Sequence, residues 1–336
     1  MQNAETVLGV LRERGRRGLP CDELYRQLFN PQMYLLAYGR IYSNKGAMTP
    51  GVTQETVDGM SLGKIRRIID AMRHERYRFK PARRTYIPKK NGKLRPLGLP
   101  TWSDKLVGEV VRLLLEAYYE PTFSDRSHGF RPGRGCHTAL REVANTWTGT
   151  TWFVEGDIAD CFGSFDQQVM LSILAEKVHD NRFLRLLRNM LQAGYLEDWV
   201  WNATLSGAPQ GGCASPVLSN IYLHQLDDFV ETVLIPEYTR GDRRARNPVY
   251  LKRPPRSREH AEPGTVPKPA RPAIGCGTCR AAIRTIPISG VCATCAIATT
   301  TCSGSPDRRP KPRRLNGAWR SFCAKTSSWN YPRTRR

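Results

Sequence analysis

The chain has 336 residues, 40% of them hydrophobic, which is enough to bury the core of one large domain or two ordinary ones. It carries 52 Lys and Arg against 30 Asp and Glu, and this formal charge of +22 favours a polyanionic partner, nucleic acid before membrane. The sequence shows no secretory signal pattern and no long apolar run, so we expect a cytoplasmic protein without membrane spans.

The N-terminal part is predicted to be helical. Apolar residues recur at helical spacing through residues 22–42, a loop rich in Gly and Pro follows at 44–51, and Ser61 is placed to cap a helix over 61–76. Next, TYIPKK and NGKLRPLGLPT are predicted to be two strands joined by a tight turn at Asn91-Gly92.

The central region alternates helices with a strand. An amphipathic pattern predicts a helix over 103–119, and WFVEGDI predicts a strand over 152–158. Three further helices are expected, the last capped by Ser215 with Pro216 in its first turn. These three helices cover 166–179, 182–195 and 215–235.

The positive charge is concentrated at the C-terminal end. Residues 263–336 hold 14 Lys and Arg against one acid, Asp307, whereas residues 1–262 hold 38 against 29. The first part therefore has the charge mixture of a folded domain. Beyond about Tyr250, Pro, Arg, Thr, Cys and Gly dominate without sustained periodicity, which predicts a disordered basic tail.

A strand that ends in an acid carries the first chemical signal, in FVEGDIADCF. The strand delivers Asp157 to the edge of a sheet, where a carboxylate and a neighbouring carbonyl can hold Mg²⁺. An aromatic side chain slightly later, Phe162, can lie under a sugar and exclude a 2′-hydroxyl group. Taken alone, a helix-capping Asp and a core Phe explain the same residues equally well.

A glycine-rich loop, GAPQGGCASP, runs from Gly207 into the predicted helix at 215. Such a loop brings backbone N–H groups close to a phosphate or a sugar, and Gln210 can add a side-chain hydrogen bond. Taken alone, this is an ordinary junction between a loop and a helix.

Basic residues flank the predicted hairpin. Lys89, Lys93 and Arg95 suit a triphosphate or a template backbone, while a solvated charged turn is the alternative and the interpretation we adopt for Lys90. The motif SHGFRPGRG follows over residues 127–135. Its Gly and Arg residues around Phe130 can either contact a nucleic-acid backbone or brace the hairpin.

The order of these motifs resembles that of group II intron reverse transcriptase–maturases. The basic hairpin, SHGFRPGRG, EGDIADCF and APQGGCASPVLSNIYL follow one another like the fingers and palm blocks of that family. LYRQLFNPQMYLLAYGRIYSNKGAMTPGV and ETVDGMS resemble its N-terminal extension, so the resemblance covers about residues 20–250. Gly163 stands where the family usually has Asp, and Thr53-Gln54 stand where Asp-Gly is usual.

The resemblance implies a role for each matching position. Asp157 corresponds to the first catalytic, metal-binding aspartate, Ile158 supplies a carbonyl ligand to Mg²⁺, and Phe162 is the steric gate against ribonucleotides. The positions implied to bind the incoming nucleotide are Lys89, Arg95, Phe162, Gln210 and Gly211. Those implied to contact nucleic acid are Lys93, Arg131 and Arg134. The implied partners are group II intron RNA, a DNA target and dNTPs.

The next block of the family, Tyr-Ala-Asp-Asp, is missing. Its two carboxylates complete a two-metal site with the first aspartate. After Asp242 the only acids are Glu259, Glu262 and Asp307, none of them in that context. We therefore expect a chain that is truncated in function and makes little or no DNA.

Two accounts explain the region where that block belongs. CGTC at 276–279 and CATC at 292–295 have the spacing of a zinc ribbon. Alternatively, codons 284–302 are read out of frame: the third base of each codon, taken with the first two of the next, permits DHPDFRRLRYVRYxDDHL. We favour the frame change, in which the paired CxxC motifs are accidental and zinc is not a cofactor.

The predicted fold is α+β: a right-hand polymerase with fingers and an incomplete palm. Residues 1–75 form a helical RNA-binding extension, 76–250 form the fingers and partial palm, and 251–336 form the low-order basic tail, which we interpret as out of frame. We also expect no thumb or maturase domain and an unprotected sheet edge beside the Asp157 strand. Two alternative functions stay open: a non-catalytic RNA-binding remnant and a zinc-ribbon protein that binds nucleic acid.

Overall fold

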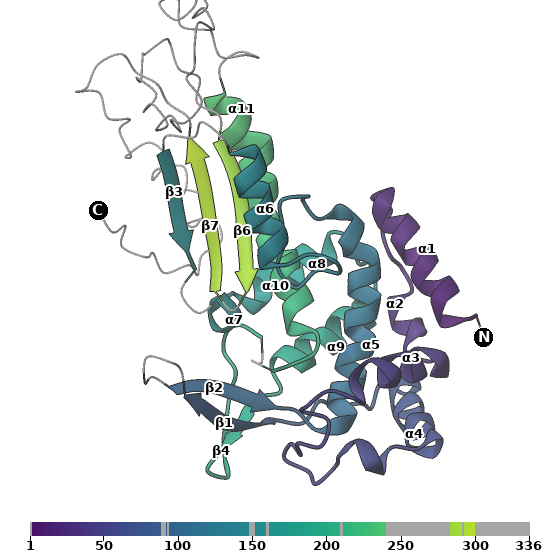
Figure 1. Ribbon diagram of the computed structural model, residues 1–336. Coiled ribbons are helices and arrows are strands. Elements are labelled where there is room, and N and C mark those ends of the chain that lie inside the picture. Colours follow the sequence, from purple (N-terminus) through teal and green to yellow (C-terminus); the bar gives the residue numbers. More distant parts are fainter. Residues whose placement is uncertain are drawn as a thin grey trace, which may run out of the picture.

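The computed structural model describes residues 2–88, 92, 94–147, 152–158, 161–208, 211–239, 283–290 and 292–299. For 152–157, 283–290 and 292–299 the description covers the backbone and its pairing. A helical body carries two separate sheets along one side, with the β1–β2 hairpin at one end and β3, β7 and β6 at the other (Figure 1). This arrangement confirms the predicted α+β class.

The N-terminal helices follow the predicted pattern. Side-chain oxygens of Asn3, Asn30 and Ser61 accept hydrogen bonds from the first turns of three of them, so polar residues fix where these helices begin. The helices are α1 (Ala4–Arg16), α2 (Leu24–Gln27), α3 (Pro31–Ile41) and α4 (Leu62–Arg73), with a 3-10 turn at Val57–Gly59.

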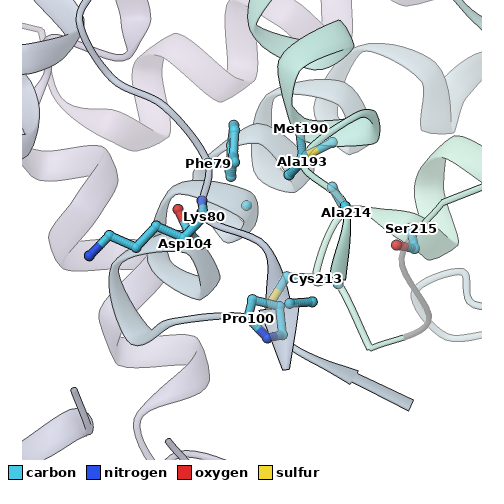
Figure 2. Close-up of a pocket in the computed structure, with 13 residues that line it drawn as sticks. Phe79, Lys80, Pro100, Asp104, Met190, Ala193, Cys213, Ala214 and Ser215 are labelled. Atoms are coloured by element: carbon cyan, nitrogen blue, oxygen red, sulfur yellow. Dashed lines mark hydrogen bonds between the residues drawn. The ribbon is translucent and has the colours of Figure 1, made fainter. Parts of the chain in front are cut away.

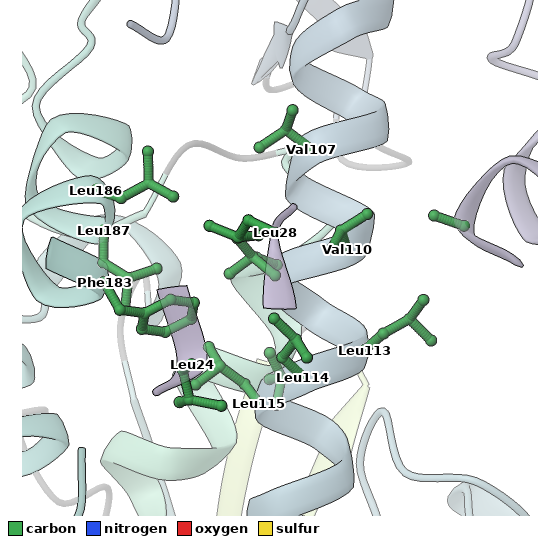
Figure 3. Packing of buried hydrophobic residues seen from close by; sticks show 14 of the residues in the cluster. Leu24, Leu28, Val107, Val110, Leu113, Leu114, Leu115, Phe183, Leu186 and Leu187 are labelled. Atoms are coloured by element: carbon green, nitrogen blue, oxygen red, sulfur yellow. The ribbon is translucent and has the colours of Figure 1, made fainter. Parts of the chain in front are cut away.

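The centre of the body is α5 (Trp102–Tyr119), which is capped by Thr101 and buried on most of its surface. Leu106, Val110 and Leu114 are fully buried there. Figure 3 shows Val110 and Leu114 in one cluster with Leu24 of α2 and with residues of α9. One continuous hydrophobic cluster runs from Ala4 to Tyr222. Residues 1–75 therefore share a core with the residues that follow, rather than packing as a separate unit.

The first sheet has the strand order β2-β1-β4-β5. The predicted hairpin pairs antiparallel, with Ile87 opposite Arg95. β4 and β5 were not predicted: the helix expected through 195 ends at Leu191, and Gly194 then turns the chain at φ 77°. The strands are β1 (Ala82–Pro88), β2 (Leu94–Leu99), β4 (Tyr195–Glu197) and β5 (Val200–Asn202).

The second sheet corrects one expectation. Its order is β3-β7-β6, made from β3 (Trp152–Asp157), β6 (Ile283–Gly290) and β7 (Cys292–Thr299). β7 pairs with β3 along its length, so the edge beside the Asp157 strand is not unprotected as expected. Residues 283–288 (IRTIPI) include three Ile and one Thr, residue types that are enriched in strands.

The remaining helices lie beside the second sheet and between it and the first (Figure 1). α6 (Cys136–Thr146) was not predicted, although its apolar residues recur at helical spacing. Ser215 is the first residue of α10 and not its cap: the cap position is Ala214, which makes no side-chain bond. The other helices are α7 (Cys161–Ser164), α8 (Gln167–Ala175), α9 (Asn181–Leu191), α10 (Ser215–Phe229), a π turn (Val230–Leu234) and α11 (Ile235–Tyr238).

Candidate functional site

The glycine-rich loop is tied to the helix that carries Phe162. The N–H of Ala208 donates to the Phe162 carbonyl at 2.8 Å, and the Ser206 hydroxyl donates to the Gly163 carbonyl at 2.7 Å. Gly207 has φ 68°, and a Cβ at this position would overlap the Phe162 carbonyl oxygen. A glycine is therefore required where the loop crosses α7.

The same loop also abuts the predicted hairpin. Gly211 has φ 106°, and a Cβ on it would overlap the Gly98 carbonyl oxygen and approach the Leu97 side chain of β2. Arg95 lies two residues from Leu97 on the same strand and hence on the same face. The described residues of the loop thus contact α7 at Ala208 and β2 at Gly211.

Several predicted positions lie outside the described residues or are described only in part. Lys89, Lys93 and Gln210 are outside them. Asp157 is the last residue of β3, directly before the partly buried Ile158 and the turn into α7. The backbone therefore places Asp157 at a strand end, as the sequence predicts, and its role stays a prediction.

The strand that pairs with β3 determines what can join Asp157. β7 runs antiparallel to β3 with Asp157 opposite Thr294, and residues 292–299 include no Asp or Glu. Among the side chains that the structure describes, no group of three His, Cys, Asp or Glu residues could hold a metal ion. Asp157 with the Ile158 carbonyl fits one end of a Mg²⁺ site, whereas the carboxylates of a two-metal site do not lie on the paired strand.

Arg131 has an internal role. Its side chain is 4% exposed and pairs with Glu120 at 3.0 Å, while it donates to the Ser124 and Ser127 carbonyls at 2.6 and 2.8 Å. This corrects the expectation that Arg131 contacts nucleic acid, because its donors are used inside the protein. Arg134 pairs with the exposed Asp125 and keeps 28% of its side chain accessible, so its contact with nucleic acid stays a prediction.

The sequence did not predict a role for Asn220 of α10, which is hydrogen-bonded to the loop that contains Arg131. Its side-chain amide donates to the Gly129 carbonyl at 2.8 Å and is buried. The contact joins two residues that are far apart in the sequence, so the Asn in the second turn of a predicted helix gives no signal of it.

A small cavity of about 40 Å³ lies behind the glycine-rich loop (Figure 2). Phe79, Pro100 and Met190 line it together with Asp104 and Cys213. Burial raises the pKa of Asp104 and raises that of the Cys213 thiol to about 11, which keeps the thiol protonated at neutral pH. The space accommodates a few water molecules and is too small for a nucleotide.

A buried carboxylic acid lies near the C-terminal end of α10. Asp227 is 5% exposed, and burial raises its pKa to about 7, with Glu231 adding to the shift and Arg131 opposing it. The acid is therefore largely protonated below neutral pH.

None of the described helices is both long and apolar enough to cross a bilayer. This finding rests on the helices of residues 2–239.

Comparison with known proteins identifies the relatives. Residues 87–238 match the family model described as reverse transcriptase (RNA-dependent DNA polymerase). The group II intron-encoded protein LtrA of Lactococcus lactis subsp. cremoris is 50% identical over 208 residues, which cover 62% of this chain and 35% of LtrA.

Two further relatives extend this comparison. The uncharacterized 91 kDa protein in the cob intron of Schizosaccharomyces pombe is 46% identical over 211 residues, covering 62% of this chain and 26% of that protein. Protein YkfC of Escherichia coli K12 is 34% identical over 233 residues, covering 67% and 61%. The chain thus spans about a third of LtrA and about a quarter of the fission yeast protein.

Proposed function

The chain belongs, over its matched part, to the group II intron-encoded reverse transcriptase–maturase family, and on that premise we propose that it carries the fingers and part of the palm of an RNA-directed DNA polymerase. The observation that supports this most is the glycine-rich loop, which contacts both α7 and β2. Through that loop the fingers hairpin, the end of the Asp157 strand and Phe162 form one surface.

Each part of this surface has a distinct task in the proposal. Arg95 and Lys89 bind the triphosphate, because guanidinium and ammonium groups pair with phosphate oxygens. Backbone N–H groups around Gly211 and the amide of Gln210 position the nucleotide. The ring of Phe162 lies under the sugar, and Asp157 with the Ile158 carbonyl would hold one Mg²⁺, which would neutralise phosphate charge.

The sequence of this chain lacks the other carboxylates that the catalytic site needs. In-line phosphoryl transfer with two metal ions needs carboxylates that bridge both ions, and β7 supplies none beside Asp157. We therefore infer that this chain binds a nucleotide without incorporating it efficiently.

The position of β7 supports the frame-change account of that loss. In the neighbouring frame, the codons of residues 296–300 permit Tyr-x-Asp-Asp, and residues 296–299 lie on the strand that pairs with β3. A strand thus occupies the place of the aspartate pair without its carboxylates. The zinc-ribbon alternative fits this strand poorly, because positions 292 and 295 fall on opposite faces of an extended segment.

Primer extension tests the proposal. With Mg²⁺, dNTPs and an RNA template annealed to a DNA primer, we expect nucleotide binding that Arg95→Ala weakens, and little or no extension. Extension that survives Asp157→Ala would contradict the assigned site. Absence of nucleotide binding would contradict the polymerase interpretation altogether.

The second candidate function is a non-catalytic RNA-binding remnant, favoured by the basic exposed face of α4. Arg66, Arg67 and Arg73 are exposed there, with Asp70 as the one acid of that helix. We expect intron RNA and its DNA target as partners, held mainly through phosphates. Charge reversal of these arginines would lower RNA affinity and reduce its salt dependence, while nucleotide binding stays unchanged. A metal assay that finds stoichiometric zinc would favour the zinc-ribbon protein instead.

A further inference from the structure

Phe130 has an unusual conformation and an unusual neighbour. Its backbone φ is 53°, in the left-handed region that a bulky residue seldom adopts, and 48% of the residue is exposed. Its ring meets the ring of Phe162 at a centroid distance of 5.8 Å and an interplanar angle of 79°. This T-shaped contact is the geometry that aromatic pairs prefer.

The loop around Phe130 is held on both sides. His128 is hydrogen-bonded to Thr138 at 2.8 Å and to Glu142 at 3.1 Å. Next in the chain, the Gly129 carbonyl accepts a hydrogen bond from Asn220. These contacts connect the loop to α6 and α10.

The C-terminal side of the loop is fixed by Arg131, whose buried guanidinium joins Glu120 to two loop carbonyls. A strained residue persists only where its surroundings over-determine it. Since a half-exposed Phe gains little from burial, folding alone gives no reason to hold this ring here. The specific contact that the strain secures is the one with Phe162.

The backbone of Phe162 is already fixed by the hydrogen bond from Ala208 to its carbonyl. A backbone contact leaves the side-chain torsions free, so the direction of the Phe162 ring needs a second constraint. In the described part of the chain, the aromatic neighbour recorded for this ring is Phe130.

We propose that Phe130 is a positioning residue that sets the direction of the Phe162 ring and thereby the discrimination against a 2′-hydroxyl group. This inference rests on the proposed function, in which Phe162 lies under the sugar. Without the Phe130 ring, the Phe162 ring can turn away and admit a ribonucleotide.

Nucleotide binding by the full chain tests this inference. The dissociation constants for dATP and ATP are measured for the wild type, Phe162→Ala, Phe130→Gly and Phe130→Tyr. Phe130→Gly is informative because glycine adopts φ 53° without strain, so this variant loses the ring with little risk of misfolding. Phe130→Tyr keeps the ring, and Leu140→Ala on the exposed face of α6 is the control.

We expect the wild type to prefer dATP and Phe162→Ala to lose the preference. Phe130→Gly should lower it about 2- to 10-fold, the range that aromatic pair energies convert to, through tighter ATP binding with dATP binding unchanged. Phe130→Tyr and Leu140→Ala should behave like the wild type. In the Phe162→Ala background, Phe130→Gly should have no further effect.

Two results separate the possible failures. If Phe162→Ala changes the preference and Phe130→Gly does not, the positioning role is wrong and the proposed function stands. If the wild type shows no preference, or Phe162→Ala leaves it unchanged, the sugar-binding role of Phe162 fails, and the role of Phe130 fails with it.

Discussion

The two sheets of this chain differ in which parts of the sequence supply their strands. The β2-β1-β4-β5 sheet carries interlocking side chains: Arg84 stacks on the Tyr195 ring at 3.6 Å, and Tyr86 donates to Glu197. In the β3-β7-β6 sheet, β3 comes from the region that matches the reverse transcriptase family model, while its partners come from the basic segment after 250.

This difference teaches that strand pairing and catalytic chemistry can be separated. Backbone hydrogen bonds pair β7 with β3 whatever residues β7 carries, because every non-proline residue offers the same N–H and C=O groups. A metal site, by contrast, needs particular side chains. In the proposed function, the chain therefore keeps the paired backbone of the palm at β3, while β7 lacks the acids that catalysis needs.

The largest expected effect comes from replacing the residues after about 250 by those of the neighbouring frame. Because this supplies the aspartate pair beside Asp157, we expect Mg²⁺-dependent primer extension to rise at least about 100-fold above that of the present chain. Asp157→Asn in the restored chain should remove the gain. A restored chain that folds but extends no primer would contradict the claim that the missing acids, and not the pairing of the strands, make the present chain inactive.

The core shared by the helices gives the next largest effect. Leu114 on α5 is fully buried, so Leu114→Ala should lower the free energy of unfolding by about 2–5 kcal/mol in urea denaturation. The matched control is Leu140→Ala, which removes the same atoms from a residue that is 58% exposed and should change stability by less than about 0.5 kcal/mol. Equal losses in both variants would contradict the assigned core.

Substitution in the glycine-rich loop tests whether its close approach to β2 matters for nucleotide binding. Gly211→Ala puts a Cβ against the Gly98 carbonyl in a left-handed conformation, so the loop must move away from β2. We expect dNTP binding to weaken about 10-fold, as measured by titration. Gly133→Ala is the control, since Gly133 has φ 69° with open space around it; it should cost about 1 kcal/mol of stability without affecting dNTP binding.

A smaller, pH-dependent effect is expected at Asp227. Its folded pKa of about 7 lies above the ordinary pKa of an aspartic acid, 3.8, so the folded state binds more protons between these values. The stability that this carboxyl contributes is fully present below its pKa in the unfolded chain, and it is lost as the pH rises to its pKa in the folded chain. Asp227→Asn should therefore raise the free energy of unfolding by a few kcal/mol at pH 8 and much less at pH 4. An equal effect at both pH values would show that burial does not shift this acid.

Much of the fold follows from local signals. Asn3, Asn30 and Ser61 mark helix starts, because an N-cap acts within three residues of itself. The hairpin follows from its alternation and its tight turn. In contrast, the chain between β4 and β5 turns at Asp198 and Trp199, both left-handed, where no glycine marks the turn.

The candidate site was predictable where residue type dictates chemistry and not where packing does. Gly207 and Gly211 were in a loop selected for its glycines, and the structure shows which backbone each one approaches. Arg131 was expected to bind nucleic acid because a sequence cannot show that three acceptors surround its guanidinium. The contact between Phe130 and Phe162 joins residues 32 positions apart, so no local pattern reveals it.

The most direct test of the central claim, that a reverse transcriptase is interrupted before its aspartate pair, is the nucleotide sequence encoding residues 245–336. The account predicts that the codon of Ala296 ends in T and those of Ala298 and Thr299 end in G, which spells Tyr-x-Asp-Asp in the neighbouring frame, with that frame open downstream. Other third bases at these codons, or a stop codon directly after them in that frame, would contradict it.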